Sequence, residues 1–356
     1  MDEGSEEYFD RLVDEDALRS YLASRLEPVD SFAVERHAEG HSNETLFVEW
    51  GDRTFVIRRP PPGETADTAH QVLREYRAQD ALQDTPVPVA PTVLACEDES
   101  VIGSEFYVME LVETTVIREE EPDRFAAPEM RTTLGNELVD QLATIHQIDY
   151  ESVGLGDFGH PEGYTDRQVE RWQKQLDWAF ERTEDVRTVP TLDRVGEWLE
   201  DNKPDEHPHT LVHGDYKLDN VGFAPGTPPE IAAIFDWEMS TLGDPRADLG
   251  WMLVYWRDAG DPPVDGAETG PHFTTAEGYP DRQTLVERWE DLTGFTFEHE
   301  RFYRALGIFK LAGLGEMFFR RHLEGNADDP TYPKMEEQVP ALADRALRII
   351  EGDEPL

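Results

Sequence analysis

Residues 211–220 read LVHGDYKLDN, and the order of apolar and polar residues in this stretch decides the fold. The segment Thr210 to Val212 reads as a short buried strand, and a polar turn with Asp215 follows directly, with Asn220 five residues further on. A second short strand, Ile231 to Phe235, ends in the acidic turn DWE at residues 236–238. The sequence therefore contains two short strands that each lead straight into polar side chains.

The polar residues after these strands are of the types that phosphoryl transfer requires. An aspartate such as Asp215 can orient an attacking hydroxyl group and accept its proton, while the amide oxygen of Asn220 and the carboxylate of Asp236 can hold Mg²⁺ against the phosphates of ATP. A chance acidic turn is the alternative, since the chain contains 77 Asp and Glu residues. The joint match of both motifs, each behind a strand, argues against chance.

This HGDxxxxN…D arrangement resembles the catalytic segment of the aminoglycoside-phosphotransferase and choline-kinase group, which are relatives of the protein kinases. In that group HxDxxxxN replaces the HRDxxxxN of protein kinases, and an aspartate, an apolar residue and an acid replace DFG. The resemblance implies that Asp215 is the catalytic base and that Asn220 and Asp236 are Mg²⁺ ligands. It further implies that Glu238 helps a second ion and that His213 braces the loop rather than carrying a proton.

A second segment of the same resemblance follows the predicted metal-binding aspartate. Residues 243–251 read GDPRADLGW and lead into a predicted helix. By this resemblance, Asp248 is expected to brace the catalytic loop by accepting hydrogen bonds from backbone N–H groups.

A phosphate-covering loop is expected near the N-terminus, between two strand-like runs. Gly40, His41, Ser42 and Asn43 form this loop, and their backbone N–H groups could bind phosphate oxygens. Taken alone the motif is weak, because a plain hairpin turn would look the same. The family has a GxSN-type loop at this place, so the resemblance implies a nucleotide-binding role.

The lysine that kinases use to bind the α- and β-phosphates is missing, because Lys174 is the first lysine of the chain. Arg58 occupies the corresponding position, and arginine can contact phosphate through two N–H groups. The segments VIRRPP and REY resemble the subfamily that is fused to acyl-CoA dehydrogenases, which implies that Glu75 is the partner of Arg58. The alternative is that both are surface residues. In the fold implied by the resemblance, the backbone near Glu110 and Val112 is the hinge that binds adenine.

The acceptor pocket is the least defined part of the predicted site. The segment GYTDRQVERW resembles one in the same subfamily and contains Tyr164, Arg167, Arg171 and Trp172. Its basic residues could favour an anionic acceptor, or they could form ordinary salt bridges on a helix surface. The sequence alone leaves both interpretations open.

The expected fold class is α+β, with the bilobal architecture of protein kinases. Residues 1–30 are expected to form an N-terminal helix, with apolar residues at helical spacing from Phe9 to Leu26, which packs on the small lobe. Residues 31–112 are expected to form the small antiparallel sheet that binds the nucleotide. Residues 113–356 are expected to form a helical lobe with the catalytic and metal-binding loops.

Composition limits the partners and the environment. The 356 residues carry a net charge of −45 with few lysines, which repels nucleic acid and anionic lipid and indicates a protein adapted to high salt. No apolar run is long enough to span a bilayer, and the acidic N-terminus lacks the pattern of a signal peptide. We therefore expect a cytoplasmic protein without a membrane or nucleic-acid partner and with no obligate protein partner.

The predicted activity is transfer of the γ-phosphoryl group of Mg-ATP to a hydroxyl of a small molecule. The subfamily resemblance favours a hydroxylated acyl metabolite over an antibiotic. The alternatives are a nucleotide-binding pseudokinase, which the missing lysine favours, and a metal-dependent hydrolase, which lacks further histidine ligands. The sequence does not define the acceptor, the oligomeric state, the choice of ATP or GTP, or whether Arg58 fully replaces the lysine.

Overall fold

The structure is a computed structural model that describes residues 3–37, 43–62, 66–261, 269–325 and 329–356, with side chains described from residue 8 in the first helix and from residue 72 in the third. The chain forms two compact units. The first unit contains Met1–Thr114 and Ala232–Ser240, and the second contains Thr115–Ile231 and Thr241–Leu356. Residues 232–240, which chain order alone would place with the helical part, thus belong to the first unit.

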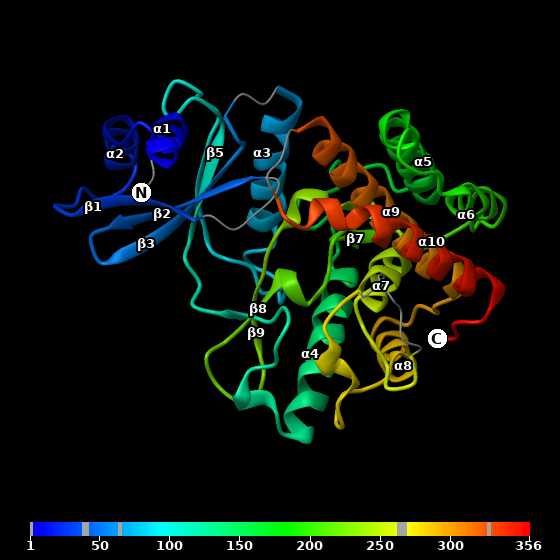
Figure 1. The fold of residues 1–356 in the computed structure, drawn as a ribbon. Helices are drawn as coiled ribbons and strands as arrows, with labels where there is room; N and C mark the ends of the chain where they lie inside the picture. The colour runs from blue at the N-terminus through cyan, green and yellow to red at the C-terminus, as the bar shows by residue number, and fades with distance from the viewer. Residues whose placement is uncertain (1–2, 38–42, 63–65, 262–268, 326–328) are drawn as a thin grey trace. The chain divides into compact units, whose positions relative to one another are not determined.

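The first unit is built on a five-stranded antiparallel sheet with the strand order β1-β2-β3-β5-β4 (Figure 1). A tight hairpin turn at Gly51 joins β2 to β3 and pairs Trp50 with Arg53, and the φ of 64° at Gly51 suits a glycine. The strands are β1 (Phe32–His37), β2 (Glu44–Trp50), β3 (Arg53–Arg59), β4 (Thr92–Cys96) and β5 (Phe106–Glu110).

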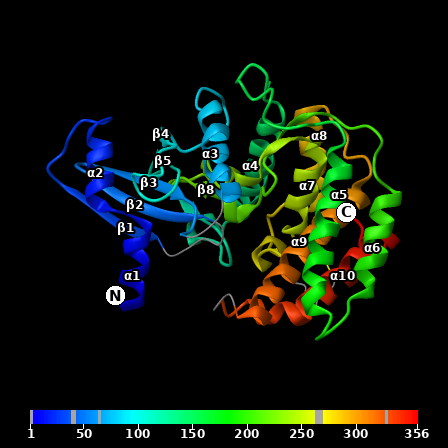
Figure 2. The same ribbon diagram turned by 90° about the horizontal axis from the view of Figure 1, so that it is seen from above.

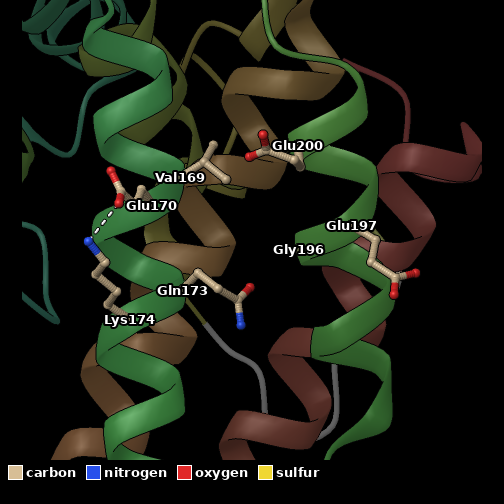
Figure 3. Close-up of a pocket in the computed structure, with 7 residues that line it drawn as sticks. All are labelled: Val169, Glu170, Gln173, Lys174, Gly196, Glu197 and Glu200. Atoms are coloured by element: carbon tan, nitrogen blue, oxygen red, sulfur yellow. Dashed lines mark hydrogen bonds and ion pairs between the residues drawn. The ribbon is translucent and has the colours of Figure 1, made fainter.

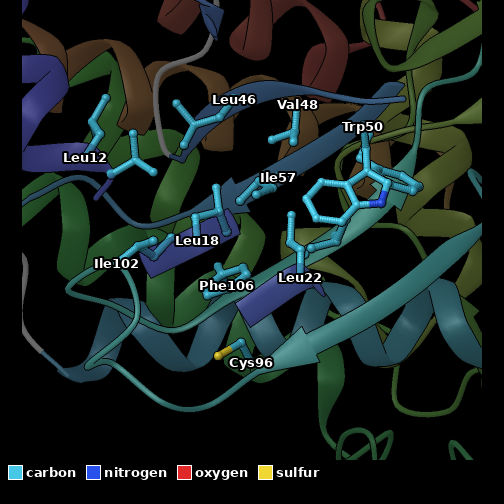
Figure 4. Close-up of a cluster of buried hydrophobic side chains, with 13 residues drawn as sticks. Leu12, Leu18, Leu22, Leu46, Val48, Trp50, Ile57, Cys96, Ile102 and Phe106 are labelled. Atoms are coloured by element: carbon cyan, nitrogen blue, oxygen red, sulfur yellow. The ribbon is translucent and has the colours of Figure 1, made fainter. Parts of the chain in front are cut away.

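Helices cover both faces of this sheet. Helices α1 (Glu3–Leu12) and α2 (Glu15–Ala23) bury Leu12, Leu18 and Leu22 against strand side chains such as Ile57 and Phe106 (Figure 4). On the other face, Val72 of α3 (Ala66–Ala81) packs with Val56 and Tyr107. Alternate residues of β3 therefore point to opposite cores, as the period of a strand requires.

The prediction of a single helix over residues 9–26 is wrong. Two helices form instead, because Asp14 caps the second one: its Oδ1 accepts a hydrogen bond from the N–H of Ala17 at 3.0 Å. The apolar residues on either side of this break still face one core, which is why their spacing resembled that of one helix.

The second unit is mainly helical, and α9 (Glu300–Glu324) is buried along most of its length. Helix α9 packs against α5, α7 and α10, which run beside it in Figure 2. The mainly helical larger lobe of the expected fold class is confirmed. The remaining helices are α4 (Pro128–His146), α5 (Tyr164–Thr183), α6 (Pro190–Asp201), α7 (Pro245–Val254), α8 (Arg282–Thr293) and α10 (Met335–Glu351).

Short strands carry the polar motifs between these helices. Strand β7 (Thr210–Val212) pairs with β10 (Thr241–Gly243), and β6 (Thr115–Val116) pairs with β8 (Val221–Phe223). A 3₁₀ turn, η2 (Leu218–Asn220), joins β7 to β8. Within the described part of the chain, every helix is too short or too polar to cross a membrane.

Short elements also lead into the acidic turn of residues 236–238. Strand β9 (Ile231–Ile234) precedes Asp236, and the 3₁₀ turn η3 (Trp237–Met239) follows it in the first unit. Trp237 is fully buried, and its indole N–H donates to the carbonyl of Ile234 at 2.9 Å. A core residue thus anchors the turn between its two acids.

Candidate active site

Arg58 lies at the centre of the polar cluster in the first unit. Its Nη1 donates to Oγ1 of Thr45 at 3.0 Å, its Nε lies 3.6 Å from Oε2 of Glu75, and its Nη2 lies 3.7 Å from Oδ1 of Asp236. Strand β3, helix α3 and the 236–238 turn each contribute one of these charged groups. Glu75 is only 1% exposed, so the alternative of two surface residues does not hold.

The surrounding carboxylates keep Arg58 charged. Burial acts to lower the pKa of Arg58, but the charges of Glu75, Tyr107 and Asp236 outweigh it and raise the pKa above its ordinary value. Burial in turn raises the pKa of Glu75, although Arg58 opposes that shift. A permanent cation beside two carboxyl groups is the electrostatic arrangement that can hold phosphate and metal together.

Asp236 adopts a backbone conformation that is uncommon for a residue other than glycine. Its φ of 65° and ψ of 59° lie in the left-handed region, which aspartate tolerates better than most residues. Such conformations cost roughly 1–3 kcal/mol and cluster at functional sites. Two residues on, Oε2 of Glu238 accepts a hydrogen bond from Nδ2 of Asn43 at 3.1 Å. The end of the predicted phosphate loop therefore touches the acidic turn, while Gly40, His41 and Ser42 lie outside the described residues.

The predicted hinge has part of its backbone already paired. The N–H of Glu110 donates to the carbonyl of Pro91 at 2.8 Å, and the N–H of Leu111 donates to that of Thr54 at 3.1 Å. The Glu110 side chain forms an ion pair with Arg53, and Val112 packs beside the buried cluster around Val56. An adenine base would have to use other backbone groups of this segment.

In the second unit, the carboxylate of Asp215 is held from three directions. Nδ2 of Asn220 donates to Oδ2 at 2.8 Å, the indole N–H of Trp251 donates to Oδ1 at 2.8 Å, and Nζ of Lys217 lies 3.1–3.2 Å from both oxygens. Asn220 also donates to the backbone carbonyl of Asp215 at 2.8 Å. Because the Asn220 nitrogen faces Asp215, its amide oxygen is the atom left to bind a cation, which fits the proposed role of a Mg²⁺ ligand.

The charges around Asp215 favour its ionised form. Burial acts to raise the pKa of Asp215, but the charges of Lys217 and Lys310 outweigh it and lower the pKa below its ordinary value. The group is therefore a carboxylate at neutral pH, which is the form that can accept a proton from an attacking hydroxyl.

Asp248 braces the loop that carries Asp215. Its Oδ2 accepts the backbone N–H of His213 at 2.6 Å, and its Oδ1 accepts that of Gly214 at 2.8 Å. Nε2 of His146 lies 3.4 Å from Oδ2, and the indole N–H of Trp289 donates to Nδ1 of His146 at 3.0 Å. Since Trp289 can only donate, the Nδ1 atom is the acceptor, and the proton of a neutral His146 lies on Nε2 and points at Asp248.

His213 has the contacts of a structural brace. The side chain is fully buried, and its Nδ1 accepts the backbone N–H of Asp215 at 3.2 Å. Gly214 between them has a φ of 83°, a conformation that favours glycine. The HGD sequence thus forms a tight turn that presents the Asp215 side chain.

Three residues at this site were not predicted from the sequence. Lys217 and Trp251 contact the Asp215 carboxylate, and Nζ of Lys310 donates to the Gly214 carbonyl. Lys217 lies inside the quoted motif of a chain with only five lysines, which is a signal that could have identified it. Lys310 lies in an apolar helix far along the chain, so no local pattern marks it.

The four predicted acceptor residues differ in their surroundings. Tyr164 is buried against Gly243, and Trp172 is buried beside Gly313, with Nζ of Lys310 5.9 Å from its ring. The Arg167 guanidinium donates to the carbonyls of Glu162 and His160, so it braces its own loop, which does not favour a substrate contact. Arg171 is exposed and lies over the Trp172 ring at 5.2 Å.

A separate groove of about 400 Å³ lies between α5 and α6 in the second unit (Figure 3). Lys174 and Glu170 form an ion pair at its edge, and three glutamates make the groove acidic. None of the predicted site residues lines it, so it is not the candidate active site. The lining residues are Val169, Glu170, Gln173, Lys174, Gly196, Glu197 and Glu200.

Comparison with known families agrees with this geometry. Residues 33–282 match the model of the phosphotransferase enzyme family. The chain belongs to this family. The match contains the Arg58 cluster and the Asp215 loop, and it confirms the expectation of a phosphotransferase.

Individual relatives refine the family assignment. The chain is 32% identical over 348 residues to acyl-CoA dehydrogenase family member 11 of Homo sapiens, covering 94% of this chain and 43% of the relative. The chain thus spans less than half the length of this relative, and the predicted resemblance to the dehydrogenase-linked subfamily is confirmed.

Solved structures confirm the protein-kinase-like fold. A candidate aminoglycoside phosphotransferase from Ralstonia eutropha has a TM-score of 0.81 and 32% identity, covering 95% of this chain and 98% of that one. An ADP-bound aminoglycoside phosphotransferase, APH(2'')-Ib, has a TM-score of 0.58 at 14% identity, covering 94% and 99% of the two chains. The second likeness shows the fold alone.

Proposed function

We propose that this phosphotransferase moves the γ-phosphoryl group of Mg-ATP to a hydroxyl group of a small molecule. The observation that carries the proposal is the Asp215 carboxylate, which is ionised and oriented by Asn220 and Trp251. A nucleotide-binding module without catalysis would not need a carboxylate held in this way.

The predicted metal and nucleotide ligands have the chemistry that these roles need. Asn220 and Asp236 would each be a ligand of Mg²⁺, which supplies positive charge against the phosphate oxygens when bound. Glu238 would assist a second ion, and its bond to Asn43 ties this acid to the phosphate loop. Arg58 would take the place of the usual lysine at the α- and β-phosphates.

In the proposed reaction, the acceptor oxygen attacks the γ-phosphorus, its proton passes to Asp215, and the bond from the γ-phosphorus to the bridging oxygen of ADP breaks. The Asp215 carboxylate already accepts hydrogen bonds from Asn220, Trp251 and Lys217, so an acceptor hydroxyl must displace one of these donors. The contact from Lys217 is the longest of the three, and its ammonium group is carried by a flexible side chain. We infer that its ammonium group leaves Asp215 and neutralises charge on the transferred phosphoryl group.

The proposed acceptor is a hydroxylated acyl metabolite. The support is the similarity to acyl-CoA dehydrogenase family member 11, whose dehydrogenase name indicates acyl chemistry in the longer protein. The cations Lys217 and Lys310 lie near Asp215 in the second unit, and Arg171 lies near Lys310, which suits an anionic compound better than a polycation.

The protein is also proposed to work at high salt. With a net charge of −45, the acidic side chains repel one another in dilute buffer. Molar salt shortens the Debye length to about 3 Å and so screens this repulsion. Assays therefore belong in molar KCl. The cytoplasmic location stays a prediction.

The test is acceptor-dependent ADP release from Mg-ATP in molar KCl, with hydroxyacyl-CoA esters, amino alcohols, sugars and aminoglycosides as acceptors. Asp215→Asn is expected to lower kcat by roughly 10²- to 10⁴-fold with ATP affinity nearly unchanged. Asp185→Asn is the matched control, because the Asp185 side chain is 72% exposed just after α5. Clear ATP binding without turnover on any acceptor would favour the pseudokinase, and near-full activity of Asp215→Asn would refute the assignment of the base.

A further inference from the structure

Lys310 is a buried cation that the proposed reaction does not use. It lies in the middle of α9, is 7% exposed, and donates through Nζ to the carbonyl of Gly214. The same ammonium lies 3.8 Å from the centre of the Trp251 ring, within the range of a strong cation–π contact. One amine therefore touches both the backbone before Asp215 and a side chain that holds Asp215.

The peptide groups of Gly214 are held by buried charges of opposite sign. Its N–H donates to Asp248 of α7 at 2.8 Å, and its carbonyl accepts from Lys310 of α9. Gly214 has a φ of 83°, so this turn has no regular secondary structure to fix it. The two charges hold the residue immediately before the base from two different helices.

The side chain of Asp215 is fixed in a related way. Trp251 lies three residues after Asp248, one turn along α7, and its indole N–H donates to Oδ1 at 2.8 Å. Asn220 donates to Oδ2. The carboxylate cannot rotate without losing one of these bonds, and Lys310 on the indole face limits how far the ring can turn.

Lys310 is poorly explained as a packing residue. Burying an ammonium group costs several kcal/mol, and a methionine would fill a similar volume without that cost. Burial lowers the pKa of Lys310 to about 8, with Asp215 and Asp248 opposing the shift and Lys217 and Arg171 adding to it. The cost of burying the Lys310 ammonium group must be offset by contacts that only a cation can make.

We propose that Lys310 is a positioning residue that fixes the orientation of the catalytic base through the Gly214 carbonyl and the Trp251 ring. This inference rests on the proposed function, because it assigns a role relative to Asp215 as the base. It predicts that Lys310 affects turnover without affecting nucleotide binding, because the contacts described for Lys310 lie on the catalytic loop, α5 and α7 of the second unit.

The kinetic test compares Lys310→Met, Trp251→Phe and the double variant, with Lys174→Met as the control. Lys174 is 71% exposed on α5, so its loss should leave kcat unchanged. Lys310→Met is expected to lower kcat by about 10- to 100-fold with KM for ATP within about twofold, since misplacing a reacting group mainly slows chemistry. The double variant should lose little more than the worse single variant, because both act on one carboxylate.

A second readout needs no acceptor and no turnover. In protein labelled with ¹⁵N-tryptophan, Trp251→Phe assigns the indole N–H resonance of Trp251. Asp215→Asn and Lys310→Met are each expected to shift this resonance, because one removes the charge at its acceptor and the other removes the cation on its ring. If the residue at position 310 only filled space, Lys310→Met would not shift the indole resonance that Asp215→Asn also shifts.

The outcomes separate the two proposals. Folded Lys310→Met with kcat within twofold of the wild type, or with an unmoved indole resonance, overturns the positioning role. If the wild-type protein binds ATP but never turns over, the proposed function fails, and the resonance alone decides whether Lys310 controls the Asp215 contact. If Lys310→Met does not fold, full kcat in folded Trp251→Phe overturns the inference.

Discussion

Replacing Asp248 with asparagine tests how the catalytic loop is held. Asp248 is 1% exposed, and each carboxylate oxygen accepts one backbone N–H, from His213 at 2.6 Å and from Gly214 at 2.8 Å. Asparagine has nearly the same shape but only one acceptor oxygen. An NH₂ group in place of Oδ1 faces the N–H of Gly214, and one in place of Oδ2 faces the N–H of His213 and Nε2 of His146.

The expected loss of stability follows from these contacts. A hydrogen bond to a charged group contributes about 1.5–3 kcal/mol, and a buried donor left without an acceptor costs about 1–3 kcal/mol. The sum predicts that Asp248→Asn lowers the free energy of unfolding by about 2.5–6 kcal/mol. The pKa of Asp248 agrees in direction: burial acts to raise it, but hydrogen bonds from His146 and the Gly214 amide leave it below its ordinary value.

The assay is denaturant unfolding in molar KCl, combined with hydrogen exchange at the amides of His213 and Gly214. Exchange at these amides should be faster in the variant, because the local brace is weakened. Asp185→Asn is again the control and should change the free energy of unfolding by no more than about 0.5 kcal/mol. A loss below about 1 kcal/mol for Asp248→Asn, with unchanged exchange, would refute the brace.

Three further predictions concern stability. The free energy of unfolding of the wild type relative to Lys310→Met should rise by about 3 kcal/mol between pH 8 and pH 10.4. In this range the unfolded chain binds a proton that folded Lys310, whose pKa is about 8, has lost. A flat difference across this pH range would contradict the prediction. Glu316→Gln should lower the free energy of unfolding, measured with denaturant, by about 3 kcal/mol, because Arg187 lies 2.7 Å from the fully buried Glu316 and would lose its charge partner. The control Glu324→Gln on the same helix should lower it by less than about 0.5 kcal/mol. Equal losses would be evidence against the buried pair. The thermal unfolding midpoint should rise steadily from 0.1 M to molar KCl, as screening removes the repulsion of the net charge of −45, and a midpoint independent of salt would argue against salt adaptation.

The contact between Asn220 and Asp215 was predictable because it is local in sequence, while the catalytic role of this segment stays a prediction. Asp215 and Asn220 lie in one turn, so their spacing alone brings the amide to the carboxylate. The brace by Asp248 and the pair of Arg58 and Glu75 required the family resemblance, because these contacts join separate elements. The mainly helical second unit was expected from the fold that the resemblance implies.

Other features could not be read in this way. Periodicity did not separate α1 from α2, because the break at Asp14 leaves the apolar side facing the same core. Lys310 is surrounded in sequence by apolar residues that predict a buried helix, and only the fold brings it to Gly214. Arg167 looked like a ligand-binding cation, yet its guanidinium is used by backbone carbonyls of the preceding loop.

The arginine on β3 also affects how this enzyme can be detected chemically. The five lysines are Lys174, Lys203, Lys217, Lys310 and Lys334, so the first unit has no lysine amine. A reagent that acylates amines would find no lysine on β3, because an arginine guanidinium that stays protonated does not react. Apart from the N-terminal amine, such a reagent could mark this chain only at lysines of the second unit.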